Sequence, residues 1–274
     1  MRAVRSSGVL AGVALAALMA IHGTAAADTV RIERANVSYR VPGEFLNGGL
    51  PVNAPLLNAN VERVFDIMKR QVTRGEYARC SAASACKPLD GTGDDALPAT
   101  GVSWDDATAY AAWLSRETGQ NWRLPTDREW ALAAGSRYRD DVYTEISDPA
   151  NPSRRWIAIY DAETERQQEI DAEVKPVGSF GENEHGLQDL AGNVWEWTDT
   201  CYTRSRDDGA GAKTEIENCG VRIAQGRHRA YMSGFFRDPK AGACSVGTPP
   251  THLGIRLVRD TPGAIDRLRN LLIW

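Results

Sequence analysis

The sequence has no excess of positive charge. Its 32 Lys and Arg residues are outnumbered by 36 Asp and Glu, which gives a formal net charge of −4. Residues 1–27 hold two arginines and no acid, so the rest of the chain carries 30 cationic against 36 acidic side chains, a net charge of −6. Because nucleic-acid-binding proteins usually need a basic face, no nucleic-acid partner is expected.

The motifs of several enzyme classes are also missing. The chain has no GxSxG motif, P-loop or dinucleotide-binding fingerprint where one would carry weight. After residue 27 only His185, His228 and His252 remain, and none stands at a metal-site spacing such as HxxxH. An iron or zinc site would therefore require the fold to bring these histidines together.

Linkers, repeats and low-complexity runs are absent, which favours a single domain after the N-terminal segment. Near the C-terminus, Ile265, Leu268 and Leu272 stand at helical spacing after a Pro-Gly pair. We expect this tail, residues 261–274, to form a short helix that packs on its own domain. A partner-binding helix is the alternative.

The first 27 residues have the pattern of a secretory signal peptide. Arg2 and Arg5 precede an apolar run from Gly8 to about Ile21, and an Ala-Ala-Ala cleavage pattern ends at residue 27. The run is too short to span a bilayer, although an uncleaved anchor is the alternative. The residue directly after the cleavage site is Asp28 and not a cysteine, so a lipoprotein is not expected. We predict a periplasmic or secreted protein that starts near Asp28 and has no membrane span after cleavage.

Five cysteines follow this segment, and an oxidising compartment favours disulfides among them. Cys80 and Cys86 enclose a short loop and are the pair we expect first. Of Cys201, Cys219 and Cys244, one is left over if the other two pair, and the sequence leaves open which one. The leftover thiol is either buried and inert or reactive.

Three helix starts have capping-box spacing. Segments beginning at Thr73, Ser103 and Thr126 each place an acid three residues after a hydroxyl, which predicts reciprocal hydrogen bonds at a helix N-terminus. Short extended runs are expected at 61–68 and 254–258, and long irregular stretches at 135–190 and 201–225. The pattern predicts an α+β fold with short helices, short strands and much ordered coil.

Four segments occur in an order that resembles the formylglycine-generating enzyme, or sulfatase-modifying factor, family. They are FDIMKRQVTRGEYARC (65–80), GVSWDDATAYAAWLSRETGQNWRLPTDREWALAAG (101–135), HGLQDLAGNVWEWTDT (185–200) and LGIRLVRD (253–260). The combination of RLPTDREW with GNVWEW is highly specific. The resemblance implies a C-type-lectin-like α+β domain over residues 60–260, after an N-terminal extension at 28–59, and often a calcium ion.

The resemblance implies a calcium site in the DLAGNVWEW stretch. The residues that match the family's ligands are Asp189, Gly192, Val194 and Glu196. Carboxylates and backbone carbonyls suit calcium, and a tight turn at Gly192 would let them converge. The alternative is an acid hydrogen-bonded in a tryptophan-rich turn without metal. A second family site would fall within 140–165, where the sequence departs too far for ligands to be assigned.

The resemblance also implies where copper would bind, and there the chain departs from the family. The family's oxidases hold copper with two cysteines five residues apart, since thiolate suits soft Cu(I). Those positions fall on Ser233 and Asp238, neither of which is a thiol. Copper and formylglycine generation by the usual mechanism are therefore not expected.

The remaining pocket candidates follow the same comparison. Trp195 matches a tryptophan that lines the family's substrate groove. The stretch GRHRAYMSGFFRD gathers Arg227, His228, Arg229, Ser233, Arg237 and Asp238, and its guanidinium groups could bind a carboxylate or phosphate. The alternative is an ordinary loop whose arginines pair with acids.

Three hypotheses for function follow. The first is an exported, oxidoreductase-like relative that matures or oxidatively modifies a periplasmic peptide or protein without the two-cysteine copper mechanism. The second is a non-catalytic, calcium-braced lectin-like module that binds a peptide, glycan or protein. The third is a formylglycine-generating oxidase with relocated thiols, for which Cys219 and Cys244 would have to converge.

Overall fold

The computed structural model describes residues 27–146, 148–166, 173–208, 213–239 and 252–261. Outside these residues lie nearly all of the expected signal segment, Cys244, and the C-terminal tail beyond Thr261. Within the described part, no helix has the length and apolar character needed to cross a membrane.

All three predicted capping boxes are confirmed. Thr73, Ser103 and Thr126 are the N-caps of α1 (Arg74–Ala82), α2 (Trp104–Thr118) and α3 (Asp127–Ala134). In each, the hydroxyl accepts the N–H three residues on, and the acid there accepts the N–H of the cap residue. Gly119 ends α2 in a left-handed conformation, as a C-terminal glycine often does.

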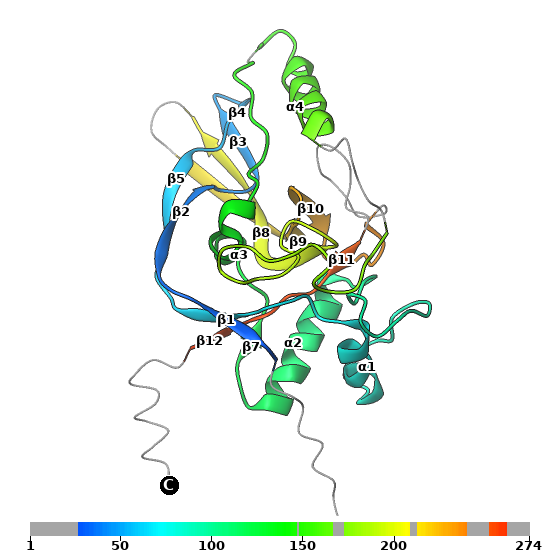
Figure 1. Ribbon diagram of the computed structural model, residues 1–274. Coiled ribbons are helices and arrows are strands. Elements are labelled where there is room, and N and C mark those ends of the chain that lie inside the picture. The colour runs from blue at the N-terminus through cyan, green and yellow to red at the C-terminus, as the bar shows by residue number, and fades with distance from the viewer. Residues whose placement is uncertain (1–26, 147, 167–172, 209–212, 240–251, 262–274) are drawn as a thin grey trace, which may run out of the picture.

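A four-stranded sheet joins the two ends of the described chain (Figure 1). Its strands, in spatial order, are β1 (Thr29–Ile32), β6 (Phe65–Met68), β12 (Val258–Asp260) and β7 (Trp122–Arg123). The strand pairs are all antiparallel. The segment expected as an N-terminal extension thus contributes β1 to the same sheet as β12.

The second sheet carries four of the candidate site residues, Trp195, Glu196, Arg229 and Ser233. Its strands, in spatial order, are β10 (Arg229–Ser233), β9 (Lys213–Gln225), β8 (Trp195–Asp207), β3 (Glu44–Asn47) and β4 (Leu50–Val52), with β11 (Leu253–Gly254) parallel to β8. A separate antiparallel pair, β2 (Ala35–Arg40) and β5 (Leu56–Val61), curves along one side of the molecule.

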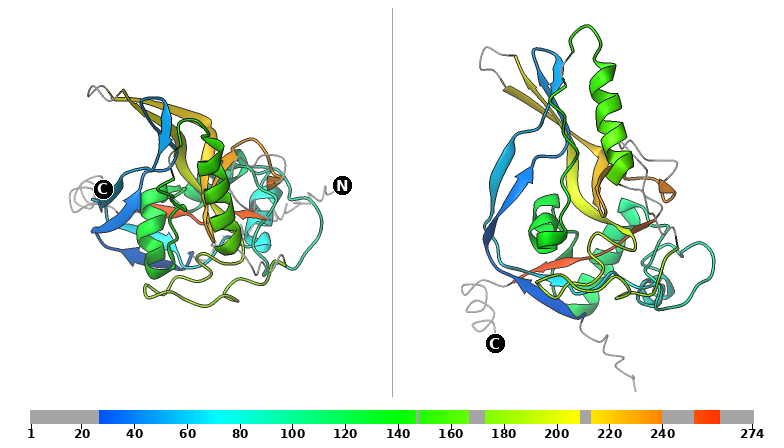
Figure 2. Two further views of the ribbon diagram at one scale, coloured as in Figure 1. Left: turned by 90° about the horizontal axis from the view of Figure 1, so that it is seen from above. Right: turned by 45° about the horizontal axis from the view of Figure 1, so that its top comes forward.

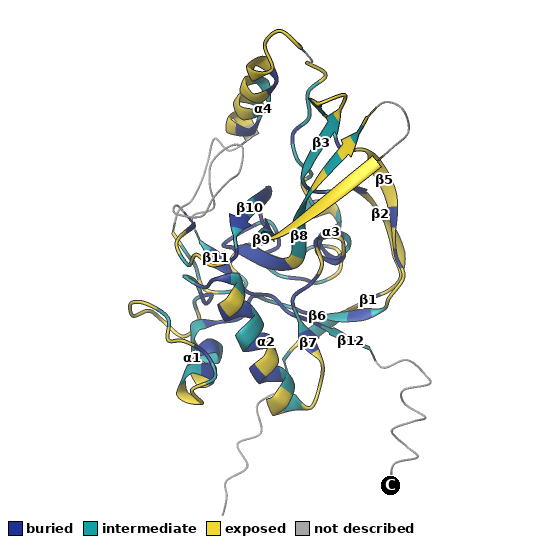
Figure 3. Ribbon diagram, turned by 180° about the vertical axis from the view of Figure 1, so that it is seen from behind, coloured by how far each residue is buried: buried dark blue, intermediate teal, exposed yellow. Residues whose placement is uncertain are grey.

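Two stretches predicted as irregular contain regular elements. The 201–225 stretch lies mostly in β8 and β9, and this part of the prediction is wrong. The two strands form a long hairpin whose outer part is exposed, so it lacks the apolar alternation that marks a half-buried strand (Figure 3). Among the described residues of the 135–190 stretch, the helices are the short 3-10 helix η1 (Gly135–Arg137) and α4 (Ser153–Arg166), and most of the others are irregular. The extended run at 61–68 is divided between the end of β5 and β6.

The core combines aliphatic side chains with several large aromatic ones. Trp130 and Trp197 are fully buried, as are Tyr77 and Phe65. Helices α1 and α2 pack together below the second sheet, whereas α4 lies at the other end of the molecule beside β3 and β4, with which it lines a cavity (Figures 1 and 2). The α+β class with short helices is therefore confirmed.

Candidate functional site

Trp195 and His228 pack against each other inside the domain. The indole Nε1 donates to the His228 carbonyl over 3.1 Å, and the two rings meet edge to face with centroids 5.4 Å apart. Gly226 permits this contact, because a Cβ there would lie 2.7 Å from the indole. Each side chain is only 3% exposed. Trp195 is thus a packed residue here, not the wall of an open groove.

Arg229 is also buried, and it is surrounded by acids. Its Nη1 lies 2.8 Å from Asp141 Oδ2 and 3.4 Å from Asp140 Oδ1, and its Nη2 lies 3.2 Å from Asp127 Oδ2. The Nη2 group also donates to the Tyr138 hydroxyl. Burial alone would lower the pKa of Arg229, but Asp127 and Asp141 hold it well above its ordinary value. The guanidinium is therefore a neutralised interior charge, as the alternative of arginines paired with acids predicted.

Tyrosines complete this buried cluster. Each of three hydroxyls donates to one of the carboxylates: Tyr39 to Asp127 at 2.7 Å, Tyr143 to Asp140 at 2.8 Å and Tyr231 to Asp141 at 2.9 Å. Burial raises the pKa of all three tyrosines above the ordinary value. Burial also raises the pKa of Asp140, although Arg229 works in the opposite direction. The hydroxyls therefore stay protonated at neutral pH and act as hydrogen-bond donors.

A cavity of about 590 Å³ opens over this cluster, which we call the acid–arginine groove. It is lined by Arg40, Leu56, Tyr138, Arg139, Asp140, Asp141, Tyr143, Glu163, Arg227 and His228. A smaller cavity, which Arg229 and Tyr231 help to line, shares Asp141, Tyr143 and Glu163 with it. The Arg40 guanidinium lies 3.9 Å from the centre of the Tyr143 ring. Of the predicted pocket residues, Arg227 and His228 reach this groove.

Three of the four expected calcium ligands surround a side-chain nitrogen. The Nε2 atom of Gln71 lies 2.9 Å from Glu196 Oε1 and 3.4 Å from the carbonyl oxygens of both Gly192 and Val194. Asp189 turns elsewhere and accepts the backbone N–H groups of residues 178 and 180. The four residues therefore do not present an open oxygen cage, and calcium binding stays a prediction from the resemblance.

Glu196 has further partners that sequence reasoning did not assign. Arg256 donates from Nε to Oε2 at 2.9 Å and from Nη2 to Oε1 at 2.8 Å, and the Trp130 indole donates to Oε2 at 2.7 Å. The carboxylate between the two indoles is thus neutralised by a fully buried guanidinium. Gln71, Trp130 and Arg256 all lie within the segments that resemble the family, so the resemblance contained them without giving them a role.

No other metal centre is evident in the described ranges. There, no group of three or more His, Cys, Asp or Glu side chains is placed to hold an ion. The segment 140–165, where a second calcium site was expected without assigned ligands, begins with the acids that pair with Arg229 and continues into α4.

The comparisons with known proteins agree with the fold. The Sulfatase-modifying factor enzyme 1-like domain model matches residues 20–261. An inactive C-alpha-formylglycine-generating enzyme 2 from Bos taurus is 36% identical over 41% of this chain and 36% of its own length. A formylglycine-generating enzyme from Streptomyces coelicolor is 31% identical over 62% of this chain and 55% of its own.

The chain belongs to the formylglycine-generating enzyme, or sulfatase-modifying factor, family. The matches cover about half or less of the length of these curated relatives. The solved structure of PvdO from Pseudomonas aeruginosa has the same fold, with a TM-score of 0.54 at 22% identity over 85% of this chain and 94% of that one.

Of the two positions that the resemblance assigns to copper in this family member, Ser233 is the last residue of β10 and Asp238 lies five residues beyond it. Ser233 is half-buried and pairs with Val221 on β9, whereas Asp238 is exposed. Between them, Arg237 forms an ion pair with Asp106, with 2.7 Å between Nε and Oδ2. Ser233 and Asp238 belong to neither of the cavities over the Arg229 cluster. The predicted pocket residues thus divide between two separate places in the fold.

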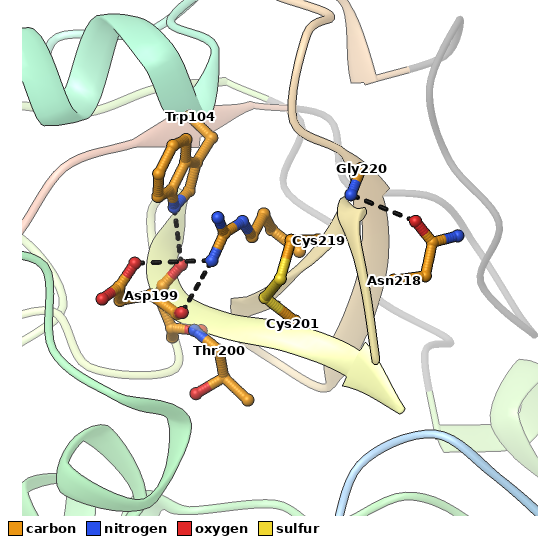
Figure 4. Close-up of a disulfide and its surroundings, with 9 residues drawn as sticks. Trp104, Asp199, Thr200, Cys201, Asn218, Cys219 and Gly220 are labelled. Atoms are coloured by element: carbon orange, nitrogen blue, oxygen red, sulfur yellow. Dashed lines mark hydrogen bonds and ion pairs between the residues drawn. A yellow bond between two sulfur atoms is a disulfide. The ribbon is translucent and has the colours of Figure 1, made fainter. Parts of the chain in front are cut away.

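Four cysteines of this family member are paired. Cys80–Cys86 is confirmed, and Cys201 pairs with Cys219 across the β8–β9 hairpin. Figure 4 shows the second disulfide near Trp104 and Asp199, on the sheet that carries Ser233. The hypothesis of relocated copper thiols required Cys219 to meet Cys244. Because Cys219 is bonded to Cys201, the structure does not support that pairing.

Proposed function

We propose that this protein takes part in maturing a peptide or protein in the periplasm or after secretion, by oxidative or related modification. We further propose that it does not use the two-cysteine copper mechanism. The observation that carries this proposal is the lack of a thiol at the two positions that the resemblance assigns to copper, which are Ser233 at the end of β10 and Asp238 five residues beyond it. Neither side chain supplies the soft thiolate that Cu(I) prefers.

Export is supported by the cysteines. Disulfides persist in oxidising compartments and are rare in the reducing cytosol. This domain contains two, and one joins strands of the sheet that carries the candidate residues. Together with the signal-peptide pattern of residues 1–27, they favour a periplasmic or secreted location.

The acid–arginine groove is the binding site that we propose for the substrate. Its volume of about 590 Å³ lies within the range of small-ligand sites, so it suits a few residues of a peptide. Two of its acids are paired with arginines, Asp140 with Arg40 of the groove and Asp141 with the buried Arg229. A polar, uncharged segment would meet hydroxyls and paired charges there without a large desolvation cost.

A non-catalytic binding module is the second candidate function. Burial favours it, because Trp195 and Arg229 are 3% and 2% exposed and therefore offer no reactive surface. A relative named as inactive is 36% identical to this chain over the matched region, which supports the same interpretation. Such a module would need the groove but no chemical step.

The decisive experiment compares the periplasmic peptides and proteins of cells with and without this gene by mass spectrometry. A covalent mass change that requires the gene supports maturation, whereas unchanged masses together with retained binding support the module. Tyr143→Phe removes a groove hydroxyl and should weaken either activity. Tyr160→Phe, on the exposed side of α4 and 54% exposed, is the matched control.

The absence of the two-cysteine copper mechanism is tested on the purified protein. We expect no retained copper and no oxygen-dependent conversion of a cysteine-containing sulfatase-type peptide. The double variant Ser233→Cys, Asp238→Cys should gain Cu(I) binding if the two positions lie as the resemblance implies. Stoichiometric copper and turnover in the unmodified protein would overturn the proposal.

A further inference from the structure

The loop from Asp189 to Val194 is wound so that two of its carbonyl groups face the same point. Asp189, Ala191 and Asn193 have φ values of 61°, 57° and 63°, in the left-handed region that residues other than glycine seldom adopt. Such an alternation persists only where surrounding contacts hold it. The carbonyl oxygens of Gly192 and Val194 both point toward the Gln71 side chain.

Gln71 is fixed at this point by its backbone. It lies between β6 and α1, and its side chain is fully buried. The next residue, Val72, donates its N–H to the Ile255 carbonyl and accepts the N–H of Ala99, both over 2.8 Å. The amide therefore enters the loop from a rigid part of the core.

We infer that the Gln71 amide takes the place that calcium was expected to occupy, so that this loop is braced by hydrogen bonds instead of by an ion. The oxygens of Gly192, Val194 and Glu196 that would ligate a calcium ion are the ones that face the Gln71 amide nitrogen. The distances of 2.9 to 3.4 Å from Nε2 are those of hydrogen bonds and close polar contacts. Oxygen ligands of calcium lie nearer, at about 2.3–2.6 Å.

The charge at the site agrees with a neutral occupant. Glu196 contributes one negative charge, and Arg256, fully buried beside it, supplies one positive charge. The Asp189 carboxylate is engaged by backbone N–H groups outside this cluster of oxygens. With Glu196 and Asp189 both engaged in this way, the expected ligand set has no further acid to balance the charge of a divalent cation at this position.

The orientation of the amide follows from its neighbours. With Nε2 toward Glu196, its N–H groups meet oxygen acceptors. The reverse orientation would bring Oε1 against three oxygens, which is repulsive without a cation. In the described structure Oε1 is buried and makes no hydrogen bond, so the brace leaves one acceptor unsatisfied. A carboxylate at this position would instead add an acid to a ready set of calcium ligands.

The test measures calcium directly. The intact exported protein, purified without chelator, is analysed for calcium by elemental mass spectrometry, and its Tm is recorded in calcium and in chelator. We expect less than stoichiometric calcium and the same Tm in both. Gln71→Glu should bind one calcium, and its Tm should rise by about 5–10 °C when calcium is about a hundred times above its Kd.

Gln120→Glu is the matched control, because it makes the same change at an exposed residue beside Arg259. It should show no calcium response. One tightly bound calcium in the unmodified protein would overturn the inference, as would a folded Gln71→Glu variant that ignores calcium. If Gln71→Glu folds only in calcium, that supports the inference. If it folds in neither condition, the calcium content of the unmodified protein decides alone.

Discussion

Replacing Arg229 by methionine should destabilise the domain strongly. Methionine keeps much of the side-chain volume, so the loss of stability should come mainly from the missing charge and only to a small extent from an empty cavity. The buried guanidinium lies 2.8 Å from Asp141 and 3.2 Å from Asp127. Removing one partner of a buried ion pair costs about 3–5 kcal/mol, because the other charge stays in a low-dielectric interior. For a domain of this size, that corresponds to about 6–20 °C in Tm.

The assay is urea unfolding followed by tryptophan fluorescence, which gives the free energy of unfolding. Arg154→Met is the matched control. Arg154 pairs with Asp148 at 3.1 Å, but its side chain is 61% exposed. An exposed pair contributes only about 0–1 kcal/mol, so the control should be nearly as stable as the unmodified protein.

The pH dependence of the Arg229→Met variant identifies the cause of its instability. Burial already raises the pKa of Asp140, and Arg229 opposes that rise. Without Arg229 the folded-state pKa of Asp140 rises further, so the folded variant takes up a proton more readily than the unfolded chain as the pH falls. The difference in the free energy of unfolding between the unmodified protein and Arg229→Met should therefore become smaller toward mildly acidic pH. A loss below about 1 kcal/mol, or one that does not change with pH, would refute this account of a buried charge cluster.

Two further predictions concern the rest of the domain. Burial opposes ionisation of Asp106, but hydrogen bonds from Arg237 and Ser103 outweigh it and lower the pKa of that carboxyl below its ordinary value of 3.8. The ionised carboxylate therefore stabilises the fold above pH 3.8, and this stabilisation is lost as the pH falls below that value. Urea unfolding should show that Asp106→Asn lowers the free energy of unfolding more at neutral pH than at about pH 3. An equal loss at the two pH values would contradict a stabilising charge on Asp106. A disulfide that closes a longer loop removes more entropy from the unfolded chain. Replacing both cysteines by alanine should therefore lower the free energy of unfolding by about 3 kcal/mol for Cys201–Cys219, which are 18 residues apart, and by about 2 kcal/mol for Cys80–Cys86, which are 6 apart. The reverse order in urea unfolding would contradict this argument.

Local signals in the sequence predicted the helices well. The hydroxyl and acid of each capping box are three residues apart, so Thr73, Ser103 and Thr126 could be identified without knowledge of the fold. The β8–β9 hairpin could not, because its outer half is largely polar and β8 pairs with β3, a strand 160 residues earlier in the chain.

In the candidate site, too, local patterns could be read from the sequence, whereas contacts between distant residues could not. The stretch around Arg229 suggested a cluster of guanidinium groups facing a groove. Its decisive partners, Asp127 and Asp141, lie 102 and 88 residues earlier, and no local pattern connects them to Arg229. Likewise, Gln71 is 125 residues from Glu196, so the sequence alone could not show that its amide meets the expected calcium ligands. Long-range contacts of this kind are fixed by the topology of the sheets.

That topology also bears on when the domain can fold during its synthesis. Strand β12 lies between β6 and β7, and β11 pairs with β8, so residues 253–260 complete both sheets. Leu253, Ile255, Leu257 and Val258 are fully buried there. These residues leave the ribosome last among the described ones, and the contacts that close the core must wait for them. We expect the nascent chain to remain unfolded for most of its synthesis, which is the state that a chain needs for threading through a translocation channel.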